Sequence, residues 1–279
     1  MEAEHVICDK SLVEYDVAVI AAGAAQNYFG IKGAENTFSV GTLEEAKRAK
    51  NYLESRSPHK IIIIGSGLTG VETACALVDR LDARICVLES KNRALPQFSA
   101  NVSSFMERAL DEKGIHLMLS ACVREIEEDC MKLSDGSTLD FDMAIWTAGI
   151  KPSPFVDRLA YPKKNDEWIL TNSCLQASDN VFALGDSAWI EVGGKVASKT
   201  AVEAEHQAKQ TAKNLWRYAE GRALKEYAIL APTNSPVALI SLGCDSAVGV
   251  YGSMCITMPS RVIRALKGWI DKSFIDHFK

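Results

Sequence analysis

The stretch Lys60-Ile61-Ile62-Ile63-Ile64-Gly65-Ser66-Gly67-Leu68-Thr69-Gly70-Val71-Glu72 decides the fold of this chain. Its run of isoleucines predicts a strand that is buried on both faces, as is typical of parallel sheets. Gly65, Gly67 and Gly70 then form the pattern G-x-G-x-x-G at the turn into a helix. The first glycine permits a tight turn, the second lets the backbone approach a pyrophosphate, and the third lets helix and strand pack closely. The N–H groups at the start of the helix favour the same anion.

A second predicted strand strengthens this interpretation. Residues 84–88 form an apolar run that ends at Glu89, near the spacing expected of a carboxylate that binds the adenosine ribose. A glycine-rich turn without a ligand is the alternative, but the order strand, turn, helix, strand and acid favours a dinucleotide site. Glu89 would accept hydrogen bonds from a ribose diol and repel a 2′-phosphate, so we expect NADH rather than NADPH. Lys91 and Arg93 lie near enough in the sequence to weaken this preference.

The segments on either side indicate the domain organisation. After Glu89 the sequence predicts a helix, a short meander and a closing strand at 143–146, so that residues 59–149 form a nucleotide-binding domain. Residues 1–58 predict short strands and a helix that opens at Thr42 with a capping box. That piece has too little core to fold alone, so we interpret it as the end of a larger domain.

Composition excludes several classes of protein. The hydrophobic content of 47% and the charged content of 24% are ordinary for a globular protein, and the net charge of −5 gives no basic field for nucleic acid. We find no apolar run long enough to span a bilayer. The eight cysteines form no C-x-x-C pair and have no metal-like spacing, so we predict no metal site and interpret them as reduced thiols in a reducing compartment.

Taken in order, the motifs resemble the two-dinucleotide-binding-domain flavoproteins, in which an NAD(P)H domain is inserted into an FAD domain. The strand that ends at Ala21-Ala22-Gly23 resembles the crossover into the NAD domain, and Trp146-Thr147-Ala148-Gly149 resembles the crossover back. Residues 175–186 resemble the second FAD motif, whose aspartate holds the ribityl or pyrophosphate part of FAD. The resemblance therefore implies cofactor contacts at Gly23, Gly149, Gly185 and Asp186.

This resemblance implies an α/β fold in which a Rossmann-like NAD(H) domain is inserted into a partial FAD domain, with a short C-terminal hairpin and helix. The expected parts are a remnant of the FAD domain (1–58), the NAD(H)-binding domain (59–149), the second part of the FAD domain (150–225), and the C-terminal hairpin and amphipathic helix (226–279).

Within the superfamily the chain looks most similar to type II NADH:quinone oxidoreductases and to the ferroptosis-suppressor (apoptosis-inducing-factor-like) flavoproteins. This likeness implies that hydride passes from NADH through FAD to a quinone. It places Glu72 near nicotinamide and flavin, although a glutamate in the first turn of a helix is also favoured by the helix dipole. It places Lys199 near flavin or quinone, with a solvated surface lysine as the alternative.

The sequence also departs from the family pattern. We find no second G-x-G-x-x-G close to the N-terminus, where the family binds the ADP half of FAD. We therefore expect a fragment of a longer protein whose FAD site is incomplete in these 279 residues. Ala201-Val202 stand where many type II enzymes have Ala-Gln, and the ferroptosis-suppressor branch also lacks that glutamine. Two further functions stay open: a nucleotide-binding protein without turnover, and an NADH-dependent reductase of a small redox protein.

The last predicted helix has the pattern of a surface that contacts a membrane. Apolar residues at helical spacing share one face and basic residues flank it, as in helices that lie in membrane interfaces. The residues are Val262, Leu266, Trp269, Ile270 and Phe274, with Arg261, Arg264, Lys267 and Lys272. A helix packed on the protein's own core has the same apolar spacing. We expect peripheral membrane contact, and a cytoplasmic or peripheral membrane location.

Overall fold

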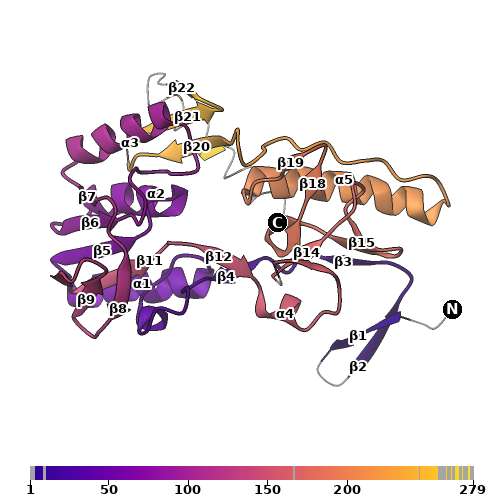
Figure 1. The fold of residues 1–279 in the computed structure, drawn as a ribbon, viewed down its shortest axis with the longest axis horizontal. Coiled ribbons are helices and arrows are strands. Elements are labelled where there is room, and N and C mark those ends of the chain that lie inside the picture. The colour runs from indigo at the N-terminus through magenta and orange to yellow at the C-terminus, as the bar shows by residue number, and fades with distance from the viewer. Residues whose placement is uncertain are drawn as a thin grey trace. The chain divides into compact units, whose positions relative to one another are not determined.

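The computed structural model describes residues 4–8, 11–165, 167–244 and 246–256, together with positions 262, 265, 268, 269, 272 and 276. The chain divides into two compact units (Figure 1). Unit 1 contains Met1–Ala25 and Ile150–Thr233, and unit 2 contains Gln26–Gly149 and Asn234–Lys279. Residues 26–58 therefore lie in the same unit as 59–149, and so does the segment from residue 234 onward.

A parallel sheet forms the centre of unit 2. Its strands lie in the order β11 (Met143–Trp146), β5 (Lys60–Ile64), β6 (Arg84–Leu88) and β7 (His116–Met118). The four isoleucines of β5 are at most 5% exposed, which confirms the predicted strand with two buried faces. Ile61 and Ile63 belong to one core cluster, whereas Ile62 and Ile64 belong to another.

Helices cover one face of this sheet and a meander covers the other. Residues of α2 (Leu68–Val78) and α3 (Ala100–Glu112) join the cluster of Ile61 and Ile63. The antiparallel meander packs against Ile62 and Ile64 through Val123, Met131 and Leu133. Its strands are β8 (Val123–Ile126), β9 (Cys130–Leu133) and β10 (Thr138–Asp140).

Helix α1 (Leu43–Arg56) begins with the predicted capping box, which the structure confirms. The Thr42 hydroxyl accepts a hydrogen bond from the Glu45 N–H at 3.2 Å, and the Glu45 carboxylate accepts one from the Thr42 N–H at 3.0 Å. These two bonds satisfy N–H groups that have no partner within the helix.

The C-terminal segment adds a small antiparallel sheet to unit 2. The predicted hairpin of β20 (Val237–Ser241) and β21 (Ala247–Tyr251) is present, and β22 (Met254–Ile256) extends it to three strands. Ile240, Val248 and Val250 are buried in the same cluster as α2 and α3. Figure 1 shows these strands, in yellow, beside α3.

The predicted membrane helix is only partly described. Trp269 is 67% exposed and Val262 is 59% exposed. Arg261, Arg264, Leu266, Lys267, Ile270 and Phe274 lie outside the described residues. Among the helices that could be searched, none is both long and apolar enough to cross a membrane.

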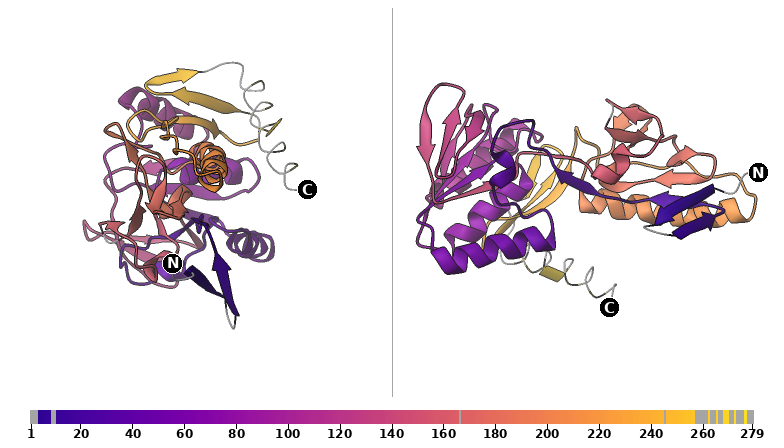
Figure 2. Two further views of the ribbon diagram at one scale, coloured as in Figure 1. Left: turned by 90° about the vertical axis from the view of Figure 1, so that its right-hand side faces the viewer. Right: turned by 90° about the horizontal axis from the view of Figure 1, so that it is seen from below.

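Unit 1 is built around short strands and one long helix. Strands β3 (Ala18–Ile20) and β16 (Val181–Ala183) pair in parallel, and β15 (Gln176–Ser178) pairs with β16. Helix α5 (Ala201–Ala219) is seen along its axis in the left view of Figure 2. The other elements are β1 (Glu4–Cys8), β2 (Ser11–Tyr15), β12 (Ile150–Pro152), α4 (Pro154–Asp157), β13 (Lys163–Lys164), β14 (Trp168–Leu170), η2 (Gly185–Ser187), β17 (Ala188–Trp189), β18 (Glu191–Val192) and β19 (Lys195–Val196). Strand β4 (Ala24–Gln26) follows β3, and the short helix η1 (Ala34–Asn36) belongs to unit 2.

Candidate functional site

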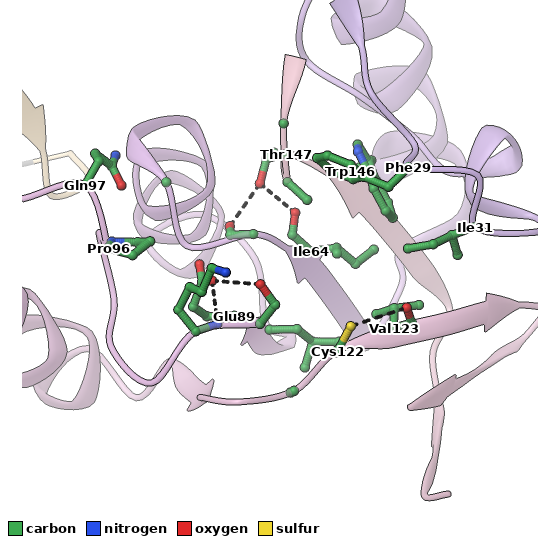
Figure 3. Close-up of a pocket in the computed structure, with 18 residues that line it drawn as sticks. Phe29, Ile31, Ile64, Glu89, Pro96, Gln97, Cys122, Val123, Trp146 and Thr147 are labelled. Atoms are coloured by element: carbon green, nitrogen blue, oxygen red, sulfur yellow. Dashed lines mark hydrogen bonds between the residues drawn. The ribbon is translucent and has the colours of Figure 1, made fainter. Parts of the chain in front are cut away.

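A cavity of about 570 Å³ lies in unit 2, where β5, β6 and β11 end (Figure 3). Its wall includes Gly65, Gly67, Glu89 and Gly149, which the sequence predicted as cofactor-binding residues. The carboxyl ends of parallel strands are the edge at which open α/β sheets bind ligands. The parallel sheet therefore gathers these residues at one candidate nucleotide site.

The three glycines of the turn differ in what surrounds them. A Cβ at Gly65, whose φ is +104°, would stand 2.6 Å from the Cα of Ala148, and a Cβ at Gly70 would stand 2.0 Å from the carbonyl oxygen of Gly65. Gly65 and Gly70 are thus required by the close packing of strand, turn and helix. A Cβ at Gly67 would meet nothing within 4 Å. The space where a Cβ of residue 67 would stand is therefore empty, and Gly67 lies on the cavity wall.

Glu89 is almost completely buried and fastens the glycine turn to the end of β6. It is 6% exposed, and its Oε2 accepts hydrogen bonds from the N–H of Ser66 at 3.1 Å and from the Ser66 hydroxyl at 2.6 Å. Its Oε1 accepts one from the N–H of Lys91 at 2.9 Å and one from the Ser90 hydroxyl at 3.3 Å. Sequence reasoning predicted a ribose ligand here and missed this structural role.

Thr147 and Phe29 complete the cavity. Thr147 belongs to the predicted crossover motif, whereas no role was predicted for Phe29. The Thr147 hydroxyl lies 3.0 Å from the carbonyl oxygens of both Ile64 and Gly65, so it holds the end of β11 against the turn. A Cβ at Gly149 would stand 2.7 Å from the ring of Phe29, which is 60% exposed. Together with Trp146, Phe29 gives the cavity an aromatic wall. Large apolar side chains with a few fixed polar groups are typical of cofactor sites.

Glu72 has a different place from the one that the sequence suggested. The first turn of α2 contains no acidic residue, so the prediction that Glu72 lies in that turn is wrong. Its carboxylate accepts a hydrogen bond from the N–H of Ser241 at 2.8 Å and thereby joins α2 to β20. Glu72 does not belong to the wall of the described cavity.

A second group of predicted residues gathers in unit 1. Strands β3 and β16 are parallel neighbours, so the segments that follow them, with Gly23 and Gly185, leave the sheet at the same edge. Both glycines have positive φ, +66° and +67° respectively, which favours glycine. The N–H of Gly185 donates to Oε1 of Gln207 on α5 at 2.7 Å. Gln207 therefore positions the turn that carries Asp186.

Lys199 is directed into this turn and is not a solvated surface lysine. Its ammonium donates hydrogen bonds to the carbonyl oxygens of Gly185, at 3.2 Å, and Ala188. The same nitrogen lies 5.9 Å from the centre of the Trp168 ring. Burial lowers the pKa of Lys199 to about 8, against the opposing effect of the Asp186 carboxylate. Burial also raises the pKa of Asp186, and the charge of Lys199 opposes that shift.

A buried acid supports the segment that carries Lys199. Glu203 is fully buried and accepts hydrogen bonds from the Tyr227 hydroxyl at 2.5 Å and from the N–H of Ala231 at 2.7 Å. The carbonyl of Ala231 in turn accepts a bond from the N–H of Ser198 at 3.0 Å. Burial raises the pKa of Tyr227, so its hydroxyl keeps its proton and remains a donor. The sequence analysis assigned no role to Glu203.

The comparison with known proteins decides the family. The profile of the family described as pyridine nucleotide-disulphide oxidoreductase matches residues 2–208. The chain belongs to this family. The suspected relationship to two-dinucleotide-domain flavoproteins and the α/β fold class are confirmed.

Individual relatives are distant. The NADH dehydrogenase-like protein YutJ of Bacillus subtilis is 29% identical over 223 residues, which cover 78% of this chain and 61% of YutJ. A type II NADH:quinone oxidoreductase of Haemophilus influenzae is 26% identical over 281 residues, covering 85% of this chain and 62% of the relative. The chain thus spans less than two thirds of the length of these proteins.

The solved structures show a shared fold. An NAD-dependent persulfide reductase from A. fulgidus superimposes with a TM-score of 0.74 at 23% sequence identity, covering 89% of this chain and 46% of that one. A reduced CoADR-RHD from Bacillus anthracis gives a TM-score of 0.73 at 20% identity, with coverage of 92% and 46%.

Proposed function

We propose that this chain carries the NADH-binding part, and part of the flavin site, of an NADH-dependent flavin oxidoreductase whose electron acceptor is a quinone. The observation that carries the proposal is the cavity of unit 2. Gly65 and Gly70 are fixed there by packing, Gly67 leaves open space, and a buried carboxylate lies at the end of the next strand. This combination fits a dinucleotide better than a glycine-rich turn without a ligand.

In the proposed complex, the start of α2 and Gly67 face the pyrophosphate of NADH, and Glu89 faces the adenosine ribose. The longest hydrogen bond of Glu89 joins it to the Ser90 hydroxyl, at 3.3 Å. A ribose hydroxyl would replace that bond, because a serine hydroxyl can rotate toward another acceptor. The carboxylate would repel the extra phosphate of NADPH. The cavity wall of Phe29 and Trp146 supplies apolar surface for the cofactor.

The proposed flavin contacts of unit 1 are Gly23, Gly185 and Asp186. Asp186 is half-buried, and a carboxylate in that position can accept hydrogen bonds from hydroxyl groups of FAD. When bound, FAD would supply the chemistry that accepts hydride from NADH and passes electrons on. Lys199, with its pKa of about 8, can hold or release a proton near neutral pH. Gly149 remains a proposed cofactor contact, and Glu72 remains proposed to lie near the nicotinamide and the flavin; both belong to unit 2.

The quinone acceptor is proposed from the relatives named type II NADH:quinone oxidoreductase and demethylphylloquinone reductase. The test is oxidation of NADH by the 279-residue chain with excess FAD and a water-soluble quinone. We expect NADH consumption that depends on both additions. Binding of NADH without turnover would favour a nucleotide-binding protein, and turnover with a ferredoxin but not with the quinone would favour a small redox partner.

Peripheral membrane contact through residues 261–279 and a cytoplasmic or membrane-surface location in a reducing compartment are part of this proposal. In the parts of the chain that the structure describes, seven cysteines are free thiols. That state is compatible with a reducing environment.

A further inference from the structure

A hollow of about 470 Å³ lies at the C-terminal end of α5 in unit 1. Four basic residues, one tryptophan and one alanine line it. They are Ala212, Lys213, Trp216, Arg217, Arg222 and Lys225. Trp216 is 67% exposed, which is unusual for so large an apolar side chain.

The backbone around this hollow is held by specific contacts. Helix α5 ends in a glycine-capped turn, where Gly221 donates to the carbonyl of Tyr218 at 3.0 Å and Arg222 donates to that of Arg217 at 2.8 Å. This turn reverses the chain. Arg217 then donates from Nε to the carbonyl oxygen of Ala223 at 2.5 Å, which fixes one wall of the hollow.

A buried amide holds the returning segment. Asn214 is fully buried, donates to the carbonyl oxygen of Lys225 at 2.9 Å and accepts from the N–H of Lys225 at 2.9 Å. The backbone that carries Lys225 is therefore fixed against α5 before any ligand arrives. Such fixed groups lose little conformational entropy on binding.

The charge of this surface is opposite to that of the chain. Lys213, Arg217, Arg222 and Lys225 are cationic, and Glu220 pairs with Arg222 at 2.8 Å. The whole chain carries a net charge of −5, so attraction of an anion must come from this local cluster. An exposed tryptophan among lysines and arginines is typical of surfaces at the membrane–water interface.

We propose that this surface, which we call the α5 hollow, docks on the anionic phospholipid headgroups of a membrane. The cations meet the headgroup charges, and Trp216 enters the interface beside them. The inference adds a second membrane-contacting surface to the one proposed at residues 261–279, and it uses no residue of the nucleotide or flavin sites. Along α5, Trp216 lies about 24 Å from Thr200 at ~1.5 Å per residue, so a headgroup there would not touch Lys199.

Vesicle flotation of the 279-residue chain tests this proposal. The vesicles contain equal parts of phosphatidylserine and phosphatidylcholine, or phosphatidylcholine alone. We expect binding only with phosphatidylserine. In K213Q/K225Q the partition coefficient should fall about 25-fold, at roughly fivefold per basic residue near the surface. W216A should also weaken binding.

The matched control is K151Q/K195Q, which removes the same charge from exposed positions of unit 1 that lie neither on α5 nor in the hollow. We expect its partition coefficient to stay within about twofold of the wild type, because charges beyond a Debye length are screened. Circular dichroism of every variant checks that unit 1 remains folded.

The proposal would be overturned if the wild type failed to float with phosphatidylserine vesicles, if it bound neutral vesicles equally well, or if K213Q/K225Q and the control lost binding equally. Unchanged binding in K213Q/K225Q would assign any membrane contact to another surface. Loss of flotation on adding soluble glycerophosphoserine would indicate a site for a free anion and would likewise overturn the lipid assignment.

Discussion

We expect Gly67→Ala to weaken NADH binding while leaving the stability of the fold almost unchanged. Gly67 has φ −67° and ψ −179°, a conformation that alanine adopts without strain, and the new Cβ would meet no atom within 4 Å. Loss of glycine at the N-cap costs about 0.5–1 kcal/mol. The reduced entropy of the unfolded chain offsets about 0.4–1 kcal/mol of that. We therefore expect the free energy of unfolding to change by less than about 1 kcal/mol.

The same methyl group would stand where the pyrophosphate of NADH must approach. If this displacement breaks one hydrogen bond to the charged pyrophosphate, binding becomes less favourable by about 1.5–3 kcal/mol. The Kd for NADH should thus rise at least about tenfold. Calorimetric titration with NADH and urea unfolding of the same sample measure the two quantities.

Gly70→Ala is the reciprocal control. Its Cβ would lie 2.0 Å from the carbonyl oxygen of Gly65, so the strand and helix must separate. Such overpacking typically costs about 1–3 kcal/mol in stability. Unchanged NADH affinity in Gly67→Ala would refute the role of the open space at Gly67. A stability loss as large as that of Gly70→Ala would show that Gly67 is required by packing instead.

Three further predictions concern both units. Glu89→Gln should reduce the preference for NADH over NADPH, because the carboxylate charge is lost; an unchanged ratio of the two Kd values would contradict this. Lys199→Met tests the buried lysine. Because the folded-state pKa of about 8 lies below the ordinary 10.5, the folded protein releases this proton first as pH rises. Wild-type stability should therefore increase relative to Lys199→Met from about pH 8 toward 10.5 in urea unfolding, and a decrease would count against the burial argument. The 279-residue chain should bind FAD weakly, since its sequence has only one G-x-G-x-x-G; a yellow protein with stoichiometric, tightly held FAD would disprove that expectation.

The sequence predicted those features that depend on local patterns. Ile61 to Ile64 indicated a doubly buried strand, and Thr42 with Glu45 indicated the start of α1; both are as predicted. These features could be predicted because strand burial and helix capping depend on residues a few positions apart. The glycine turn could be predicted for the same reason.

Contacts between distant residues were not predictable in this way. The bond from Ser241 to Glu72 joins residues 169 positions apart, and nothing near Glu72 indicates it. Nothing near Glu203 in the sequence indicates that it is buried, because the residues that contact it, Tyr227 and Ala231, lie more than twenty positions away. The third C-terminal strand and its packing on α3 likewise depend on tertiary contacts that no local spacing encodes.

A crystal structure of the chain with NADH tests the central claim most directly. The account predicts NADH in the cavity of unit 2, with its pyrophosphate against Gly67 and the start of α2 and its adenosine ribose hydrogen-bonded to Glu89. NADH bound elsewhere, or in the cavity with its pyrophosphate away from the glycine turn, would contradict the account.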